Sequence, residues 1–256
     1  QVSAEGSNPV KSDYPIESGW PTRMTNRAVR GLELLNADTS ISFDEFSAIK
    51  HDNAYSPRYR GYAYLTSVAE LEPGAPDEAQ ALSLLRHWDL HTGTANRSAA
   101  LGVGILLDEW QAERTGNALP DGRETLHTCM DSVRDVAGQL DPEWGTVQQH
   151  GRGQRIWPAA GGPDTLRAMY AEQLEDEDDF LTVVAGDGLY YLIEWNAEGE
   201  QTIRGTHQYG SQMTDESSPH YLDQAEPFSQ EIMRAPGFYP ENRSATSRQY
   251  TVSSAD

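Results

Sequence analysis

Two short segments hold residue types whose close spacing could support chemistry. His87, Asp89 and His91 would lie on one side of a strand, with the two imidazoles and one carboxylate that a metal site could use. The apolar periodicity through Leu85 instead predicts a helix that ends here, and on a helix end these three side chains diverge. We therefore expect no metal site at 87–91.

The segment at 217–224 contains Ser217, His220 and Asp223, the residue types of a hydrolase triad. Triad members normally converge from distant segments, because a short extended stretch cannot fold its own side chains onto one another. No nucleophile elbow precedes Ser217 either. We expect this segment to pack near the C-terminal strands, and a self-contained serine hydrolase using Ser217 and His220 remains a hypothesis that a fluorophosphonate probe would test.

Acidic and glycine-rich segments complete the search for ligand sites. Residues 172–179 are strongly acidic but lack the alternating oxygen ligands and central glycine of a calcium loop, so we expect a solvated loop. The glycines at 151–153 and 186–188 have no Lys-Ser pair or helix after them, which argues against a phosphate cradle. These glycines are expected to form ordinary turns.

Three arginines, Arg23, Arg27 and Arg30, lie close together at the start of one amphipathic pattern at 22–35. They could form a solvated face that pairs with Glu33 and other acidic residues. Alternatively, one of them could turn inward and orient a polar group, a task that suits the planar donor fork of a guanidinium. The spacing alone leaves both interpretations open.

The overall composition limits the classes of partner. The 256 residues are 37% hydrophobic, enough for a real core, and carry a formal net charge of −21. Such a charge repels phosphate backbones and anionic lipids, so we expect neither nucleic-acid nor membrane partners. The longest apolar run, 99–107, is about half of the roughly 20 residues that a membrane-spanning helix needs. Because residue 1 is Gln1, without a signal peptide, we expect a processed chain or a fragment.

Periodicity predicts mostly helices first and mostly strands later. Asp121 is expected to cap the clearest helix and Cys129 to lie on its buried face, while Ser42 and Glu45 form a capping box before another helix. After Trp144 the sequence becomes rich in turns, and two β-rich runs flank a turn at 196–199. The predicted class is α+β, with 1–140 mainly helical and 141–256 mainly strands and loops. The helices are expected at 24–35, from 43 onward, and at 58–71, 77–88, 98–110 and 122–139.

An ordered set of segments resembles the β-chain of penicillin acylase-type enzymes, including those described as acyl-homoserine-lactone acylases. The likeness extends from about Tyr14 to Phe228, and the order of the segments is more specific than any one of them. In chain order, they are RMTNRAVRGLELL, ISFDEFSAIKHDNAYSP, LLRHWDL, DPEWGTV, GGPDTLRAMY, AGDGLYYLIEW and SSPHYLDQAEPF.

The resemblance implies an N-terminal nucleophile hydrolase with a four-layer αββα sandwich, of which 1–256 would be the C-terminal portion of the β-chain. The family precursor cuts itself so that a Ser becomes an N-terminal nucleophile, and an Asn side chain with a backbone amide holds the oxyanion. That nucleophile is expected upstream of this chain, as is the oxyanion Asn, with Asn8 as a weaker candidate. The implied partners are the missing upstream β-chain segment and the α-chain of the same precursor.

One site residue carries over by resemblance. In relatives an arginine at the start of the helix after a Tyr-Pro pair hydrogen-bonds the oxyanion Asn, and this sequence has Arg27 at that place. The resemblance implies no cofactor. A family calcium site would need an acidic residue where this chain has Glu17 and Ser18, so calcium stays an optional structural ion.

The expected function is hydrolysis of a linear amide in a small N-acyl compound such as an acyl-homoserine lactone, a β-lactam or a lipopeptide, through an acyl-enzyme. The chain alone is expected to be incomplete and inactive, and the whole enzyme to be periplasmic or secreted. The rival hypothesis is a non-catalytic scaffold or remnant of the same fold that acts only in binding or assembly.

Overall fold

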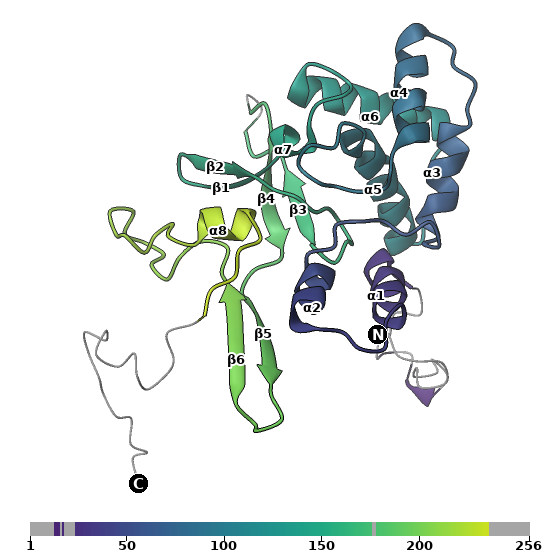
Figure 1. The fold of residues 1–256 in the computed structure, drawn as a ribbon. Helices are drawn as coiled ribbons and strands as arrows, with labels where there is room; N and C mark the ends of the chain where they lie inside the picture. The colour runs from purple at the N-terminus through teal and green to yellow at the C-terminus, as the bar shows by residue number, and fades with distance from the viewer. Residues whose placement is uncertain (1–12, 16, 18–23, 176–177, 236–256) are drawn as a thin grey trace.

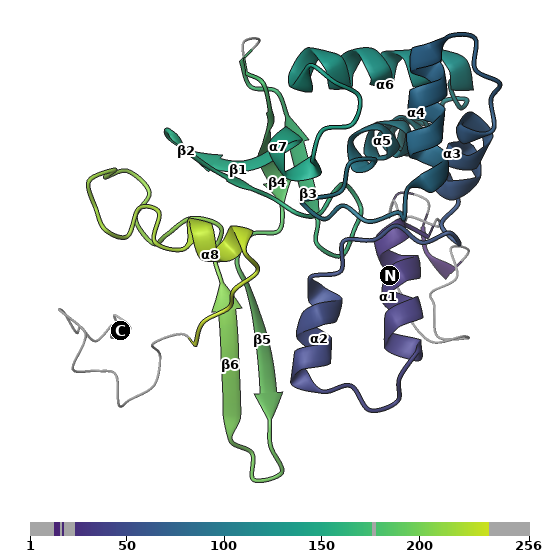
Figure 2. The same ribbon diagram turned by 45° about the horizontal axis from the view of Figure 1, so that its top comes forward.

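The structure is a computed structural model of the chain that describes residues 13–15, 17, 24–175 and 178–235. Helices α3 to α6 gather on one side, a small sheet lies beside them, and a separate hairpin projects away from the sheet (Figure 1). The same arrangement is seen in Figure 2, where α1 and α2 lie at the same end of the molecule as the hairpin. This mixture of helices and sheets confirms the predicted α+β class.

The helices follow from local signals that the sequence carries. Ser42 and Glu45 form the predicted capping box, and the Asp121 carboxylate accepts hydrogen bonds from two backbone amides of the next turn. Gly116 and Gly138 end α5 and α6 in the left-handed conformation that favours glycine. The helices are α1 (Asn26–Asn36), α2 (Phe43–Lys50), α3 (Gly61–Ala69), α4 (Pro76–His87), α5 (Ala99–Thr115), α6 (Gly122–Ala137), α7 (Trp144–Val147) and α8 (Ala225–Ser229).

The strands form two sheets rather than one continuous series. The first has the order β2-β1-β4-β3, with β1 parallel to β4 and the other pairs antiparallel; the second is the β5–β6 hairpin. The hairpin turn lies at 196–199 as predicted, but the first β-rich run splits into β4 and β5, which belong to different sheets. The strands are β1 (Gln148–Arg152), β2 (Arg155–Pro158), β3 (Met169–Glu172), β4 (Leu181–Gly186), β5 (Tyr190–Trp195) and β6 (Gln201–Thr206).

The main core lies among α3 to α7 and is centred on α5. Leu101 and Ile105 of α5 are fully buried, as is Leu126 of α6, and Cys129 is also buried as predicted. Gly102 lets the Trp88 ring lie directly on α5, because a Cβ at position 102 would overlap that ring. A second small core joins the sheet to α8 through Met169 and the other members of the cluster, Ala159, Val183 and Phe228.

The predicted apolar face of α1 is not a buried face. Met24 and Leu35 are exposed, and the buried residues of this helix are Asn26 and Gly31. The reason is that α1 is anchored by hydrogen bonds from its first turn rather than by an apolar stripe. Among the described residues, no helix is both long and apolar enough to cross a membrane.

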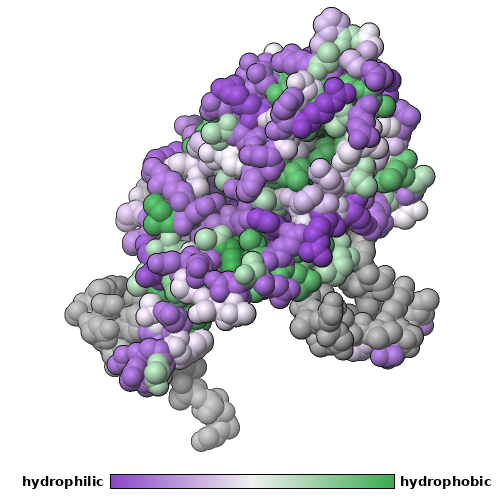
Figure 3. Space-filling view, turned by 45° about the vertical axis from the view of Figure 1, so that its right-hand side comes forward, coloured by the Kyte–Doolittle hydropathy of each residue, from purple (hydrophilic) through white to green (hydrophobic). Residues whose placement is uncertain are grey.

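The charged residues lie largely on a hydrophilic surface. The face turned forward in Figure 3 is mostly hydrophilic, with small hydrophobic patches between the polar side chains. Arginine pairs with carboxylates at several surface positions, for example Arg97 with Glu143 at 2.8 Å and Arg134 with Asp77 at 2.8 Å. The excess of carboxylates is therefore compatible with a packed helical core.

Glu78 joins α4 to α6 and makes part of the stability depend on pH. Its carboxylate accepts hydrogen bonds from the Gly74 amide, from His127 at 2.5 Å and from Arg123 at 2.8 Å. The Gly74 amide and then His127 lower the pKa of Glu78 below its usual value of 4.5. A carboxyl whose pKa is lowered by folding stabilises the protein above the unfolded pKa, and this contribution is lost as the pH falls through the folded pKa.

We therefore expect Glu78→Gln to be less stable than the unchanged chain at pH 6 and to approach it in stability below pH 4.5. Denaturant unfolding at a series of pH values measures the difference. Glu124→Gln, a change at an exposed carboxylate of α6, is the matched control and should show no such convergence. A Glu78→Gln deficit that stays constant down to pH 3 would contradict the prediction.

Candidate functional site

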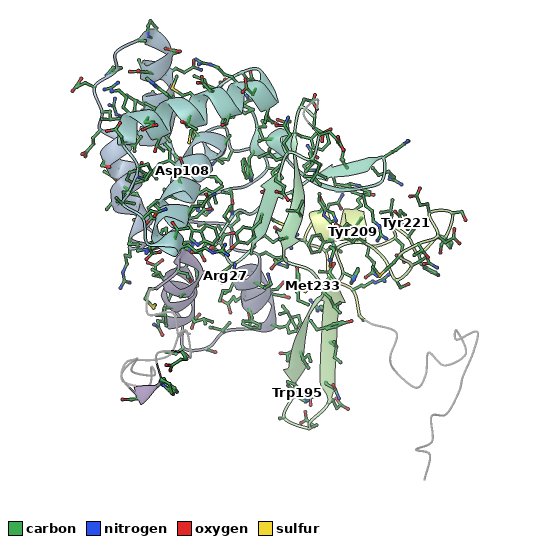
Figure 4. All side chains as sticks on the ribbon, turned by 180° about the vertical axis from the view of Figure 1, so that it is seen from behind. Arg27, Asp108, Trp195, Tyr209, Tyr221 and Met233 are labelled. Atoms are coloured by element: carbon green, nitrogen blue, oxygen red, sulfur yellow. The ribbon has the colours of Figure 1, made fainter. Side chains whose placement is uncertain are left out.

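Arg27 lies in the first turn of α1, where the chain enters the folded core. Thr25 caps this helix by accepting a hydrogen bond from the Ala28 amide at 3.2 Å. The Arg27 Nε donates to the Thr165 carbonyl at 3.2 Å, while the residue as a whole remains exposed. Figure 4 shows Arg27 at the end of α1 that meets the rest of the molecule. One edge of the guanidinium is thus fixed, and the rest of it remains accessible.

The residue before it, Asn26, is the buried anchor of the site. Its side-chain Nδ2 donates to the carbonyls of Ala54 and Asp164, at 3.1 and 3.0 Å, and its Oδ1 accepts from the Ser56 amide at 2.8 Å. Asn26 is fully buried. Three chain segments distant in sequence are therefore joined at one side chain, and this fixes the position from which Arg27 projects.

Asp164 holds the N-terminus of α1 from the opposite side. Its carboxylate accepts a hydrogen bond from the Asn26 amide at 2.6 Å, where the helix dipole favours negative charge. Burial raises the pKa of Asp164 although the Asn26 amide and the charge of Arg27 act in the opposite direction. The backbone of Asp164 has φ 60°, an uncommon conformation for a residue other than glycine. The 161–165 loop is thus shaped to present its carboxylate and the Thr165 carbonyl to α1.

The neighbouring arginine, Arg30, forms the tighter ion pair. It makes a bidentate pair with Asp52, through Nε at 3.0 Å and Nη2 at 2.9 Å, and approaches Glu33 at 3.5 Å. The hydrogen bond to Asp52 raises the pKa of Arg30. The resemblance implies that Arg27 is the arginine that orients a polar group, whereas the structure buries Arg30 more deeply than Arg27. Arg30 is thus held by an ion pair with Asp52. Among the described residues, the Arg27 side chain has a hydrogen bond only at Nε.

A second polar cluster lies beside this site. Lys50 Nζ contacts Asp187 at 2.6 Å, and Arg167 contacts the same carboxylate at 3.2 Å. Next to Lys50, His51 Nε2 lies 2.6 Å from the Tyr190 hydroxyl. Burial and the nearby positive charges of Arg167 and Lys50 lower the pKa of His51 to about 4, so its imidazole is neutral at pH 7. These contacts join α2, the loop before β3 and the start of β5.

The structure does not bring the candidate triad together. The Ser217 hydroxyl donates to Asp215 at 2.6 Å, while His220 Nδ1 lies 3.3 Å from Asp223. Among the described residues, the Ser217 hydroxyl is therefore bonded to the Asp215 carboxylate and not to the His220 imidazole, and these side chains belong to the turns that lead to α8. The Gln224 amide, which donates to the Tyr209 carbonyl at 2.8 Å, fixes this segment near the end of β6.

The residues considered as metal ligands, His87, Asp89 and His91, contact different partners instead of one another's side chains. His87 ends α4 and contacts the Ser83 carbonyl, while His91 Nδ1 contacts Asn53 at 3.2 Å. Within the described part of the chain, no group of three His, Cys, Asp or Glu side chains could hold a metal ion. Ser18 of the optional calcium site, like Arg23 and Asn8, lies outside the described residues.

Sequence analysis missed Asn26, Asp164 and Thr165 as members of this site. Asn26 precedes Arg27 directly, and the other two belong to the GGPDT segment that was used only as a family landmark. The available signal was the Gly-Gly-Pro-Asp run, which indicates a shaped loop. Nothing in the local pattern indicates that this loop reaches α1, since Asn26 and Asp164 are 138 positions apart.

A comparison with protein families explains the order of the segments that surround this site. The penicillin amidase family model matches residues 2–245, nearly the full length of the chain. The match includes α1 with Arg27, the 161–165 loop and the β5–β6 hairpin. It supports the hydrolysis of amide bonds as the type of reaction, and it shows that the chain belongs to the penicillin amidase family.

Proposed function

We propose that this chain contributes to an acylase that removes an acyl group from a small N-acyl compound through an acyl-enzyme. In the proposed mechanism an N-terminal Ser on polypeptide upstream of residue 1 attacks the amide carbon. Its own α-amino group, with a reference pKa of roughly 8, accepts the proton and passes it to the amine that leaves when the C–N bond breaks, and water then hydrolyses the acyl-enzyme to the free acid. An Asn side chain and a backbone amide stabilise the oxyanion.

The observation that carries this proposal for the present chain is the half-fixed guanidinium of Arg27. The hydrogen bond from Nε to the Thr165 carbonyl orients the guanidinium, and the buried Asn26 fixes the position of the backbone that carries Arg27. A donor fork held in this way can orient the amide oxygen of a neighbouring Asn, and correct placement of reacting groups is worth several kcal/mol in such reactions. Arg27 is thus assigned as a positioning residue.

The hairpin supports an assembly with further polypeptide. Tyr191, Ile193 and Trp195 of β5 are exposed on alternate positions, so they share one face of the strand. Figure 4 shows Trp195 near the tip of the hairpin. A two-stranded hairpin is only marginally stable in water by itself, and an additional layer over this face would stabilise it. The upstream β-chain segment and the α-chain of one precursor are the proposed source of that layer.

Arg27→Ala in the complete enzyme is expected to lower kcat at least tenfold with little change in KM, because it removes an orienting donor and no core side chain. Arg27→Lys, which keeps the charge but not the planar fork, should recover only part of the activity. Arg114→Ala, at an exposed arginine near the end of α5, is the control and should leave kcat unchanged. Normal turnover of Arg27→Ala would assign the positioning role to another residue.

The complete enzyme also tests the hypothesis that this chain is a non-catalytic scaffold. Co-production of this chain with its upstream precursor should yield an enzyme that releases free amine from N-acyl substrates. A folded assembly without any such release would favour binding or assembly alone. A fluorophosphonate probe should not label this chain by itself, since the Ser217 hydroxyl donates to Asp215 and makes no contact with His220 among the described residues.

A further inference from the structure

A half-open cavity of about 230 Å³ lies among α5, α6, α7 and the edge of the four-stranded sheet. Its lining is mainly apolar and includes Val103, Leu107, Val133 and Trp144. Gly104 contributes to the space, because a Cβ there would come within 3.0 Å of the Cys129 sulfur. An apolar cavity of roughly 150 Å³ can hold one benzene ring, so this one has room for a ring with a short chain or for a six-carbon chain.

One carboxyl group, that of Asp108 on α5, lines the cavity together with three uncharged polar side chains, those of Thr128, Ser132 and Gln148. It has no hydrogen-bond or ion-pair partner among the described residues, whereas Glu109 next to it accepts from the Tyr59 hydroxyl at 3.0 Å. Burial raises the pKa of Asp108. Figure 4 shows Asp108 among the helices, whereas Arg27 lies at the end of α1.

The chemistry of the lining selects one class of ligand. An ammonium group could donate charge-assisted hydrogen bonds to Asp108 and offset the cost of burying its charge. A ligand carboxylate would be repelled by Asp108, and an uncharged apolar molecule would form no charge-assisted hydrogen bond with this partly buried side chain. Ligand pockets of this kind combine an apolar body with few convergent polar groups.

We infer that this cavity is a binding site for small amphiphilic amines, with an apolar body of about six carbons among α5, α6 and α7 and an ammonium group at Asp108. The inferred site uses neither Arg27 nor the groups that contact it, although Pro163 of the 161–165 loop is part of the lining. Either proposal can therefore fail without affecting the other.

The test uses three probes with the same chain length: hexylammonium, hexanol and hexanoate. Titration calorimetry on the 256-residue chain in 0.15 M NaCl, which screens the net charge of −21 at distances beyond about 8 Å, should give one saturable site for hexylammonium. The expected affinity is at least tenfold higher for hexylammonium than for hexanol, and lowest for hexanoate. Equal affinity for all three probes, or no saturable binding, would overturn the inference.

Matched variants separate the head group from the cavity. Asp108→Asn should abolish the preference for hexylammonium over hexanol, while Asp131→Asn, which makes the same charge change on the exposed face of α6, should keep it. Ser132→Trp, at an exposed position in the lining, should block all three probes without altering the buried core. An unchanged preference in Asp108→Asn would overturn the inference.

Cys129, the single cysteine of the chain, gives a second readout that locates the ligand. Cys129 lines the cavity, and burial raises the pKa of its thiol to about 12, so its alkylation is slow. Saturating hexylammonium should slow this alkylation at least fivefold in the unchanged chain and not in Ser132→Trp. An unchanged labelling rate at saturation would place the amine elsewhere and overturn the inference.

Discussion

Replacing Asn26 by alanine is expected to lower the free energy of unfolding by about 3 kcal/mol. The substitution removes three side-chain hydrogen bonds and leaves the Ser56 amide and the carbonyls of Ala54 and Asp164 buried without their partner. The Asn26 backbone amide keeps its bond to Asp164, so the helix start itself is retained. The loss is therefore the cost of unsatisfied buried polar groups.

Denaturant unfolding monitored by circular dichroism measures this loss. Asn36→Ala makes the same chemical change at the exposed last residue of α1 and should alter stability by no more than about 0.5 kcal/mol. Asn26→Asp should be at least as damaging as Asn26→Ala, because it removes both Nδ2 donors and places a second carboxylate beside Asp164. A loss below 1 kcal/mol in Asn26→Ala would mean that water replaces the asparagine.

The second large effect is expected for Arg167→Met, which should destabilise the chain by about 4 kcal/mol. Only 1% of the Arg167 side chain is exposed, and its guanidinium donates to the Phe228 carbonyl at 2.7 Å and to Asp187 at 3.2 Å. It also lies 3.6 Å from Glu231 and covers the Phe228 ring. Methionine keeps much of the volume but leaves the partly buried carboxylate of Glu231 without the guanidinium of Arg167.

The pH dependence of this variant tests the electrostatic explanation. Burial already raises the pKa of Glu231 while Arg167 lowers it, so loss of the arginine should raise that pKa further. A carboxyl whose pKa is raised by folding favours the folded state at low pH, and that advantage is lost as the pH rises through the folded pKa. Arg167→Met should thus lose less stability at pH 5 than at pH 8.

The control for Arg167→Met is a change in a solvent-exposed ion pair. Arg97→Met removes a partner of Glu143, where both side chains are about half exposed, and should cost less than about 1 kcal/mol at either pH. A similar loss in Arg97→Met and Arg167→Met would contradict the role assigned to burial.

Sequence reasoning succeeded where structure is decided within one turn of the chain. Ser42 with Glu45, and Asp121 before α6, cap their helices through contacts between residues at most three apart. The burial of Cys129 follows from its place on a strongly periodic helix. Such features depend on local backbone chemistry, which the sequence contains in full.

Features that depend on distant contacts were not predictable in the same way. Asn26 is buried because it meets Asp164, and no local pattern indicates that meeting. The run that contains β4 and β5 is divided at Gly186, whose φ of 123° and close approach to the Ala168 backbone suit only glycine. Arg27 itself was chosen through family resemblance, and its positioning role stays a prediction.

The β5–β6 hairpin also has a consequence for how this chain behaves at high concentration. Among the described residues, β5 pairs only with β6, so its outer row of backbone amides and carbonyls is available to another copy. At low ionic strength the net charge of −21 makes copies of the chain repel one another. Concentrated salt shortens the range of this repulsion, so the colloidal stability of the isolated polypeptide should fall as the ionic strength rises.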